Sequence, residues 1–190
     1  LDLENKIDWY RLSINPNAIE LLKKNQDKID WDYLSENPNA IKLLEKNQDK
    51  INWNWLSSNP NAINLLKDRI EYEKSLTDAQ FNRLKNKINW TQLSANPDAI
   101  NLLKENQDKI DWFNLSANPN AIDLLLDNKH KIHWIKLCNN PSAIDLIKER
   151  IEYENSLTKE QYNNLKFYED RLRWDVLSSN PNAIELLEES

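Results

Sequence analysis

The sequence predicts an all-α fold: a helical-repeat solenoid of seven short helix-pair units, with a 22-residue period and two helical inserts. Three observations lead to this prediction. A string of the form Ile-Asp-Trp-x-x-Leu-Ser-x-Asn-Pro-Asn-Ala-Ile-x-Leu-Leu recurs along the chain. Each recurring tryptophan is followed seven residues later by a proline, and these pairs account for all 7 prolines. The apolar residues after each proline have helical spacing.

The recurring tryptophans serve as anchors that define the repeats. Successive anchors are separated by 22, 22, 37, 22, 22 and 40 residues, so two plain units precede one unit with an insert, twice over. Stacked repeats share one continuous core, and we therefore expect a single domain, 1–190. The anchors are Trp9, Trp31, Trp53, Trp90, Trp112, Trp134 and Trp174. The units cover about 1–24, 25–46, 47–84, 85–105, 106–127, 128–167 and 168–190.

The first half of each unit predicts a helix of one or two turns. In five units an Asp or Asn stands directly before the anchor, where it can cap the helix. His133 and Arg173 are the exceptions. An Ile or Leu two residues before the anchor and a Leu three residues after it form an apolar pair in every unit, which is the pattern of a hydrophobic staple. The caps are Asp8, Asp30, Asn52, Asn89 and Asp111.

The second half of each unit predicts a longer helix. Asn15 is a good N-cap, and Pro16 suits the first helical position because its missing N–H costs nothing there. The residues from Ala18 to Leu22 then form a broad apolar face. Glycine is absent from the chain, so Asn25 is the expected left-handed C-cap.

The inserts predict additional helix. Residues 69–77 and 150–158 resemble each other, and the apolar stripe of the preceding helix continues into them. Thr77 with Gln80, and Thr158 with Gln161, match a capping box, so an extra helix should start there.

A leucine-rich-repeat horseshoe has a similar period and is the rival fold. Its motif needs an apolar residue two positions before the leucine. This chain has Asp32 or Asn54 in that place. The regular Asn-Pro helix start also favours the helical solenoid.

The anchor tryptophans allow two interpretations. Exposed indoles would form a ladder of platforms for stacking bases or sugars, whereas buried indoles would pack on leucines of their own and adjacent units. Every anchor has the same place beside an apolar pair, and we therefore assign all seven to the structural core.

A lysine or arginine stands three residues before each anchor. This column could bind a polyanion, or its side chains could lie over the indole rings or reach carbonyl groups at the preceding helix end. Neighbouring aspartates neutralise the column, which favours the second interpretation. The cations are Lys6, Lys28, Lys50, Lys87, Lys109, Lys131 and Arg171.

The composition excludes several classes of function. The net charge of −6 argues against nucleic acid as the partner. The absence of glycine excludes glycine-rich phosphate loops. A single cysteine is typical of a reducing, intracellular setting, and no apolar run approaches the roughly 20 residues that cross a bilayer. The chain starts at Leu1 without any methionine, so we expect a segment excised from a longer protein.

No reaction centre is visible in the sequence. His130, His133 and Cys138 lie close together, but Cys138 occupies the place of Ser35 in the repeat and His133 that of Asp30. One variant repeat explains them better than a zinc site, which normally needs four ligands. We expect no metal, no cofactor, no catalytic residue and no enzymatic activity.

The positions one and two residues after the anchors vary most. Aromatic, charged and amide side chains interchange there, which is not typical of a core position. Exposed Tyr and Trp are favoured at protein interfaces, so we hypothesise that Tyr33, Trp55, Tyr10 and Phe113 bind a partner. The alternative is that some of these rings pack against the inserts.

The repeat string resembles repeats in proteins of giant DNA viruses, in which the Trp/Leu-Ser-x-Asn-Pro pattern recurs. The resemblance covers nearly the whole chain outside the inserts, and the Asn-, Lys- and Ile-rich composition would suit an AT-rich viral genome. It implies a location in the host cytoplasm or the virion. It identifies no catalytic or binding residue.

These observations favour a non-enzymatic repeat scaffold that mediates protein–protein interaction. The alternative is a nucleic-acid-binding helical array, in which each unit contacts one or two nucleotides through the cation column and exposed aromatic rings. The net acidity of the chain counts against the array.

Overall fold

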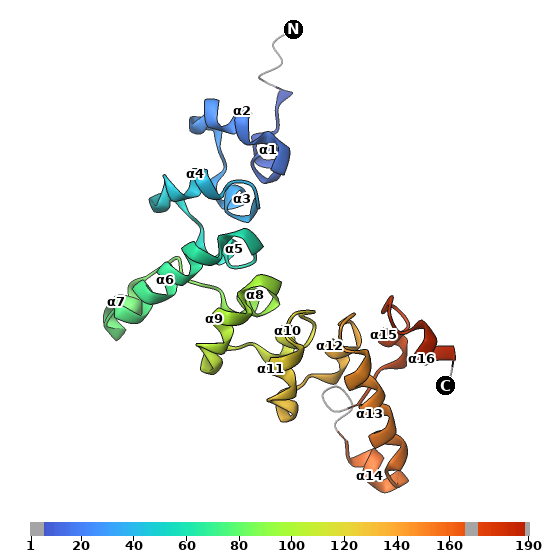
Figure 1. The fold of residues 1–190 in the computed structure, drawn as a ribbon. Helices are drawn as coiled ribbons and strands as arrows, with labels where there is room; N and C mark the ends of the chain where they lie inside the picture. Colours follow the sequence, from blue (N-terminus) through green and yellow to red (C-terminus); the bar gives the residue numbers. More distant parts are fainter. Residues whose placement is uncertain (1–5, 166–170, 189–190) are drawn as a thin grey trace. The chain divides into compact units, whose positions relative to one another are not determined.

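The computed structural model describes residues 6–165 and 171–188, and Figure 1 shows their arrangement. Every regular element in these residues is an α-helix or a 3-10 helix, and they contain no strand. The predicted all-α helical-repeat fold is therefore confirmed, and the leucine-rich alternative, which needs strands, does not fit. The first, sixth and last predicted units include residues outside the described ranges.

One helix of each repeat begins at the anchor tryptophan, and we call these the A-helices. The predicted caps are present: Asp30 Oδ1, for example, accepts the backbone N–H groups of Asp32 and Tyr33. His133 and Arg173 make no side-chain cap bond, as the sequence predicts. The A-helices are α1 (Trp9–Ile14), α3 (Trp31–Glu36), α5 (Trp53–Leu56), α8 (Trp90–Ala95), α10 (Trp112–Ser116), α12 (Trp134–Cys138) and α15 (Trp174–Leu177).

The second helix of each repeat, the B-helix, follows the Asn-Pro pair. Asn15 Oδ1 accepts the N–H of Asn17, which confirms the predicted start. The first turn, Pro16–Ala18, is a 3-10 turn, and the α-helix proper begins at Ile19. The B-helices are α2 (Ile19–Lys24), α4 (Ile41–Glu45), α6 (Ile63–Ser75), α9 (Ile100–Lys104), α11 (Ile122–Leu126), α13 (Ile144–Ser156) and α16 (Ile184–Glu188). Further 3-10 turns lead on to A-helices: η3 (Gln26–Lys28), η4 (Gln48–Lys50), η7 (Gln107–Lys109) and η8 (Lys129–Lys131).

The B-helices do not end in the left-handed cap that the sequence predicts. Asn25 has φ −132° and ψ 51°, and no residue of the described ranges has a positive φ. The side chain caps the helix instead, because Asn25 Nδ2 donates to the carbonyl of Leu21 at 2.9 Å. Asn47 and Asn128 make the same bond four residues back. This bond satisfies an orphan carbonyl without the steric cost of a left-handed backbone.

Each insert lengthens a B-helix and adds one more helix. The helices α6 and α13 both run for 13 residues, as the continued apolar stripe predicts. The capping boxes predicted at Thr77 and Thr158 are present and start the additional helices. These are α7 (Asp78–Arg83) and α14 (Lys159–Asn164).

A buried ion pair holds each insert in place. Arg69 Nε lies 3.0 Å from Glu73 Oε1, and both side chains are almost fully buried. The same carboxylate oxygen accepts the backbone N–H of Ile88, so the pair ties the lengthened helix to the segment leading into the next repeat. Arg150 and Glu154 form the same pair in the second insert, also at 3.0 Å.

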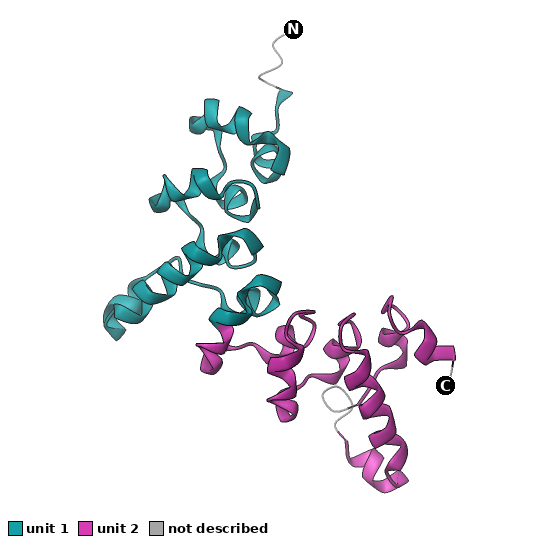
Figure 2. Ribbon diagram, in the orientation of Figure 1, with its two compact units in different colours: residues 1–102 teal, residues 103–190 magenta. Residues whose placement is uncertain are grey.

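The chain divides into two compact units, residues 1–102 and 103–190 (Figure 2). We call them unit 1 and unit 2, and each contains one insert. In unit 1, α1 packs on α3 and α3 on α5. In unit 2, α10 packs on α12 and α12 on α15. The expectation of a single domain stays a prediction.

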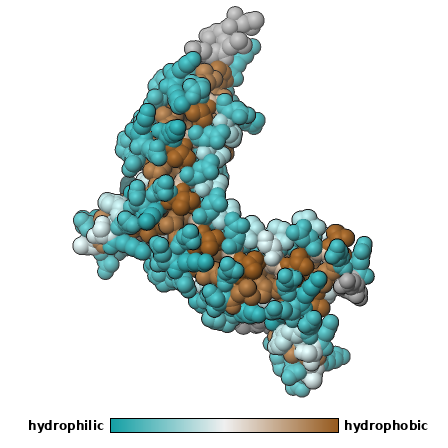
Figure 3. All heavy atoms as spheres, in the orientation of Figure 1, coloured by the Kyte–Doolittle hydropathy of each residue, from teal (hydrophilic) through white to brown (hydrophobic). Residues whose placement is uncertain are grey.

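The core of each unit is a ladder of leucines and isoleucines. From the second repeat on, the leucine three residues after the anchor is fully buried, as at Leu34, Leu56 and Leu137. The residue two before the anchor is also buried there, as at Ile29 and Ile51. The predicted staple therefore lies at the centre of the packing, where the removal of apolar surface from water stabilises the fold most. In the view of Figure 3, apolar residues are visible between hydrophilic ones over each unit.

The anchor tryptophans are less buried than the core assignment implies. Trp53 is buried, whereas Trp9, Trp31, Trp90, Trp112 and Trp134 are half-buried. Trp174 is 43% exposed, so its assignment to the core is wrong. Where an anchor is covered, the cover comes from another segment: Lys28 of the next repeat lies over Trp9, and Arg69 of the insert lies over Trp53.

A row of buried asparagines joins consecutive repeats. Asn37 Nδ2 donates to the carbonyls of Ser13 and Asn15, at 2.9 and 3.0 Å. Asn59 Nδ2 makes the same two bonds to Ser35 and Asn37, at 3.0 and 3.1 Å. The Oδ1 atom of each caps its own B-helix, so one amide both starts a helix and holds the repeat before it. Asn96, Asn140 and Asn180 do the same.

A buried serine provides a second link between repeats. Ser13 Oγ donates to the carbonyl of Trp9 at 2.7 Å and accepts the N–H of Asp30, in the next repeat, at 3.0 Å. Cys138 takes this place in its own repeat and is fully buried. Burial raises the pKa of the Cys138 thiol, partly offset by the backbone N–H of Arg173, which donates to the sulfur. The cysteine therefore acts as a variant of the serine link.

Asn59→Ala is expected to lower the free energy of unfolding by about 3 kcal/mol, because it removes a helix cap and two buried hydrogen bonds to carbonyls of the preceding repeat. The matched variant is Asn15→Ala in the first repeat. The Asn15 side chain is exposed and, among the described residues, makes only the cap bond, so its loss should cost about 1 kcal/mol. Urea unfolding followed by circular dichroism measures both. Equal losses would show that the amide does not join repeats.

Glu73→Ala is expected to lower the free energy of unfolding by about 3–5 kcal/mol, because it leaves the buried Arg69 guanidinium without its partner. Glu71, on the same helix, is exposed and gives the control. Glu71→Ala should change stability by less than about 0.5 kcal/mol. If both variants unfold at the same urea concentration, the ion pair does not hold the insert.

Candidate functional site

Three cations of the column, Lys28, Lys50 and Lys131, lie against the indole of the preceding repeat. Lys28 Nζ is 5.1 Å from the ring centroid of Trp9, and Lys50 Nζ is 4.5 Å from that of Trp31. The equivalent contact in unit 2 joins Lys131 and Trp112, at 4.5 Å. For these three pairs the structure confirms the interpretation that the lysine side chain lies over an indole ring. A cation over an indole is attracted by the ring quadrupole, so these charges take part in the packing of the repeats.

Three aromatic side chains form a continuous row on the A-helices of unit 1. We call Tyr10 on α1, Tyr33 on α3 and Trp55 on α5 the aromatic row. The ring centroids of Tyr10 and Tyr33 lie 3.7 Å apart, and those of Tyr33 and Trp55 lie 4.9 Å apart in an edge-to-face arrangement. Tyr10 is 47% exposed and Trp55 is 36% exposed, while Tyr33 is half-buried. The structure thus brings together three of the four residues predicted to bind a partner.

Helix geometry accounts for the place of the row. The anchor and the leucine three residues after it share one face of an A-helix, and that face points to the core. Positions one and two after the anchor lie on the other side, where Tyr10, Tyr33 and Trp55 are found. Neither insert contributes to these ring contacts, so the alternative that the rings pack against an insert does not describe the row.

The two tyrosine hydroxyls of the row are coupled. The hydrogen bond with Tyr10 raises the pKa of Tyr33 to about 12, with smaller contributions from desolvation and from the charges of Asp30 and Glu36. This bond favours the neutral phenol of Tyr33.

Carboxylates outnumber cations beside the aromatic row. Asp8 and Asp30 cap α1 and α3, and Asp32 and Glu36 lie on α3 itself. The cation on these two helices is Arg11, which lies 3.5 Å from Asp8, with both side chains largely exposed. The row is therefore set in a locally acidic surface.

Phe113, the fourth predicted residue, lies in unit 2 and does not belong to the row. It is 45% exposed on α10. Its ring meets that of His133 edge-on at 4.7 Å, and Lys136 Nζ lies 4.4 Å from its centroid. Unit 2 therefore places a cation over the ring where unit 1 continues with a second aromatic side chain.

Each insert forms a small cleft that the sequence analysis missed. In unit 1 the Arg69 guanidinium lies 4.9 Å from the Trp53 ring and 5.1 Å from the Tyr72 ring, beside a cleft of about 380 Å³. The equivalent cleft in unit 2 is about 410 Å³ and contains Arg150 between Trp134 and Tyr153. The signal was present in the sequence, because each of these residues recurs 81 positions later. Ion pairing to buried glutamates gives both arginines a structural role.

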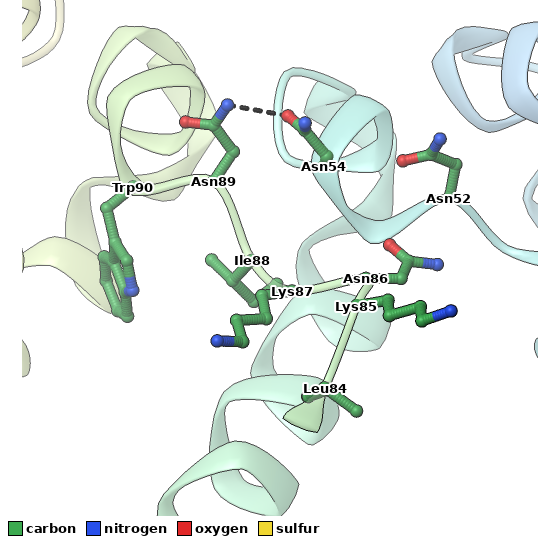
Figure 4. A pocket seen from close by; sticks show the side chains of 9 residues that line it. All are labelled: Asn52, Asn54, Leu84, Lys85, Asn86, Lys87, Ile88, Asn89 and Trp90. Atoms are coloured by element: carbon green, nitrogen blue, oxygen red, sulfur yellow. Dashed lines mark hydrogen bonds between the residues drawn. The ribbon is translucent and has the colours of Figure 1, made fainter. Parts of the chain in front are cut away.

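A polar pocket of about 570 Å³ lies beside α5 and the segment leading to α8 (Figure 4). Its amides already have partners: Asn89 Nδ2 donates to Asn54 Oδ1 at 2.6 Å, and Asn86 bonds the backbone on either side of Asn52. Lys85 and Lys87 point in different directions in Figure 4. The donors do not converge on one point, so the pocket does not define a ligand.

Two further features bear on the class of site. Within residues 6–165 and 171–188, no group of three or more His, Cys, Asp or Glu side chains could hold a metal ion. None of the helices in these ranges combines the length and apolar character needed to cross a membrane. The candidate site is therefore the aromatic row, a surface rather than a cavity.

Comparison with known proteins adds no relative. No protein-family model matches the chain, and no curated protein and no solved structure matches it. The structure alone defines the class: an all-α helical-repeat protein whose repeats are joined by buried asparagine and serine side chains.

Tyr33 is expected to ionise near pH 12 in the folded protein, against an ordinary value of 10.0. Because folding raises this pKa, the neutral phenol contributes stability that is complete below about pH 10 and is lost as the pH rises toward 12. The difference in tyrosinate absorption between the wild type and Tyr33→Phe measures this step. Tyr10→Phe removes the hydrogen bond and should move the ionisation of Tyr33 back toward pH 10. An unchanged titration in Tyr10→Phe would disprove the coupling.

Proposed function

We propose that the protein is a non-enzymatic repeat scaffold that mediates protein–protein interaction through the aromatic row of unit 1. The observation that carries the proposal is the contiguous, exposed contact of Tyr10, Tyr33 and Trp55. Tyrosine and tryptophan dominate interface hot spots because each buries a large area with few rotatable bonds.

The hydrogen bonds between the supporting helices support the proposal. The A-helices that present the row are linked by the amide of Asn37 and by the hydroxyl of Ser13, and further on by Asn59 and Ser35. The rings are also in contact with one another before any partner arrives. A pre-organised surface loses less conformational entropy on binding, which favours affinity.

The alternative function, a nucleic-acid-binding array, has less support. An array would present its cation column to phosphates, but Lys28 and Lys50 lie over indole rings of the stack. Carboxylates beside the row would also repel a phosphate backbone. Binding to DNA and RNA at increasing salt separates the two functions: the array binds at low salt with a steep salt dependence, and the scaffold does not bind.

The origin of the scaffold is part of the same proposal. The repeat string resembles that of giant-DNA-virus proteins, and on this resemblance we infer that the protein acts inside a host cell or within a virion. A scaffold of this kind would bring proteins together without acting on them chemically, and the reducing setting would keep Cys138 as a thiol.

Tyr33→Ser/Trp55→Ser is expected to weaken the binding of the protein partner by about thirtyfold or more, because two hot-spot rings are removed together. A pull-down from the native host identifies the partner, and calorimetry with the purified partner measures the loss. Leu126 on α11 is 41% exposed and lies in unit 2, so Leu126→Ser is the matched control and should bind as the wild type does.

The melting temperature shows whether the rings of the aromatic row form a binding surface or part of the core. For a binding surface it should be nearly the same in the wild type and the double variant. A double variant that unfolds would show that the rings are structural. A folded double variant with full affinity would move the partner site elsewhere.

A further inference from the structure

We infer that the segment accepted by the aromatic row is basic: an extended stretch of a partner protein rich in lysine and arginine. This inference rests on the proposed function and adds the chemistry of the partner. Three observations support it, namely the charge beside the row, the position of the cations of unit 1, and the counterpart of the row in unit 2.

The first observation is the sign of the charge around the rings. Four carboxylates, Asp8, Asp30, Asp32 and Glu36, belong to α1, α3 and their caps, against the single guanidinium of Arg11. The ionised carboxylates attract a cationic segment and repel an acidic one, and the effect acts over several ångströms at moderate salt. Exposed apolar area and negative potential thus coincide on one surface.

The second observation is the position of the lysines that could neutralise this surface. In unit 1, Lys28 and Lys50 lie over the rings of Trp9 and Trp31. Lys87 lies 4.2 Å from the ring centroid of Phe81 in the insert. None of these ring contacts involves the aromatic row, so these three lysines are held against other rings of unit 1.

The third observation is that unit 2 fills the equivalent place with a cation. Tyr10 and Phe113 both follow their anchors by one residue, and Tyr33 and Lys136 both follow theirs by two. In unit 2 the Lys136 ammonium lies 4.4 Å from the Phe113 ring centroid. The same stretch of the repeat therefore accommodates an ammonium over an aromatic ring within this chain. In unit 1 Tyr33 occupies the place of Lys136, so no lysine of that position lies beside the row.

The fold uses ring–cation contacts at several of its own junctions, at distances between 4.2 and 5.1 Å. An exposed tyrosine or tryptophan face attracts lysine and arginine by the ring quadrupole, and the aliphatic part of either side chain packs on the ring. A basic segment can therefore contact the rings and the carboxylates together. A phosphate-bearing ligand would be repelled by the carboxylates.

The test uses two fluorescein-labelled probes and the full chain. One probe is a short peptide of alternating lysine and alanine, and the other has glutamate in place of lysine. Fluorescence anisotropy should show binding of the lysine peptide alone, and that binding should weaken as salt is added. The aromatic variant Tyr33→Ser/Trp55→Ser and the charge variant Asp8→Asn/Asp32→Asn should each weaken it by about tenfold.

The charge variant is designed to leave the fold intact. Asparagine already caps the A-helix in the repeat of Asn52, and Asn54 occupies the place of Asp32 one repeat later. The control is Asp123→Asn/Asp145→Asn, which changes the net charge equally at exposed positions of α11 and α13. It should bind the lysine peptide as the wild type does.

The outcomes separate this inference from the proposed function. If the charge variant and the control weaken binding of the lysine peptide equally, the effect depends on net charge alone and the inference is overturned. Binding of the glutamate peptide would overturn it as well. The lysine peptide could fail to bind while binding of the host partner still depends on Tyr33 and Trp55. That result would support the scaffold function and overturn the inference of a basic partner. If neither depends on these rings, both proposals fall.

Discussion

The architecture depends on one hydrogen-bonding group, the side-chain amide of the asparagine before each proline. Outside the inserts the α-helices are only four to six residues long, too short to be stable by themselves. Asn37 and Asn59 are buried, and each donates to two carbonyls of the preceding repeat while its oxygen starts the next helix. A buried amide is tolerated only when its donors and acceptors are satisfied, so the bonds that stabilise each junction also specify its register.

This constraint determines which residues of the repeat are free to carry function. The anchor indole, the cation that covers it, the serine and the asparagine all take part in the junction. The position directly after the anchor can join the junction, as Asp32 and Asn54 do when they accept from the cap asparagine of the next repeat. The position two after the anchor takes no part in the asparagine and serine links, and there the chain varies between Tyr33, Trp55 and Lys136. A repeat of fixed geometry can thus vary this outer position without changing its fold.

Much of this organisation could be predicted from the sequence, because it depends on local rules. Caps such as Asp30, the Asn-Pro helix starts and the capping boxes at Thr77 and Thr158 are set by neighbouring residues. The second role of Asn37 could not be predicted. The sequence pattern of an asparagine cap is the same whether the N–H groups of its side-chain amide face water or another repeat. For the same reason Asn25 was assigned a backbone cap, although its side chain makes the bond.

Burial and the candidate site show where sequence pattern stops being sufficient. Identical spacing suggested that all anchors share one environment, yet Trp53 is buried and Trp174 exposed, because the cover comes from a different segment. Position after the anchor correctly grouped Tyr33 with Trp55, but it could not separate Phe113, whose surroundings in unit 2 supply Lys136. The two units therefore share a backbone plan and differ in the charge set beside their outer rings. That difference arises at positions outside the buried asparagine and serine links, where a substitution leaves the junctions between repeats unchanged.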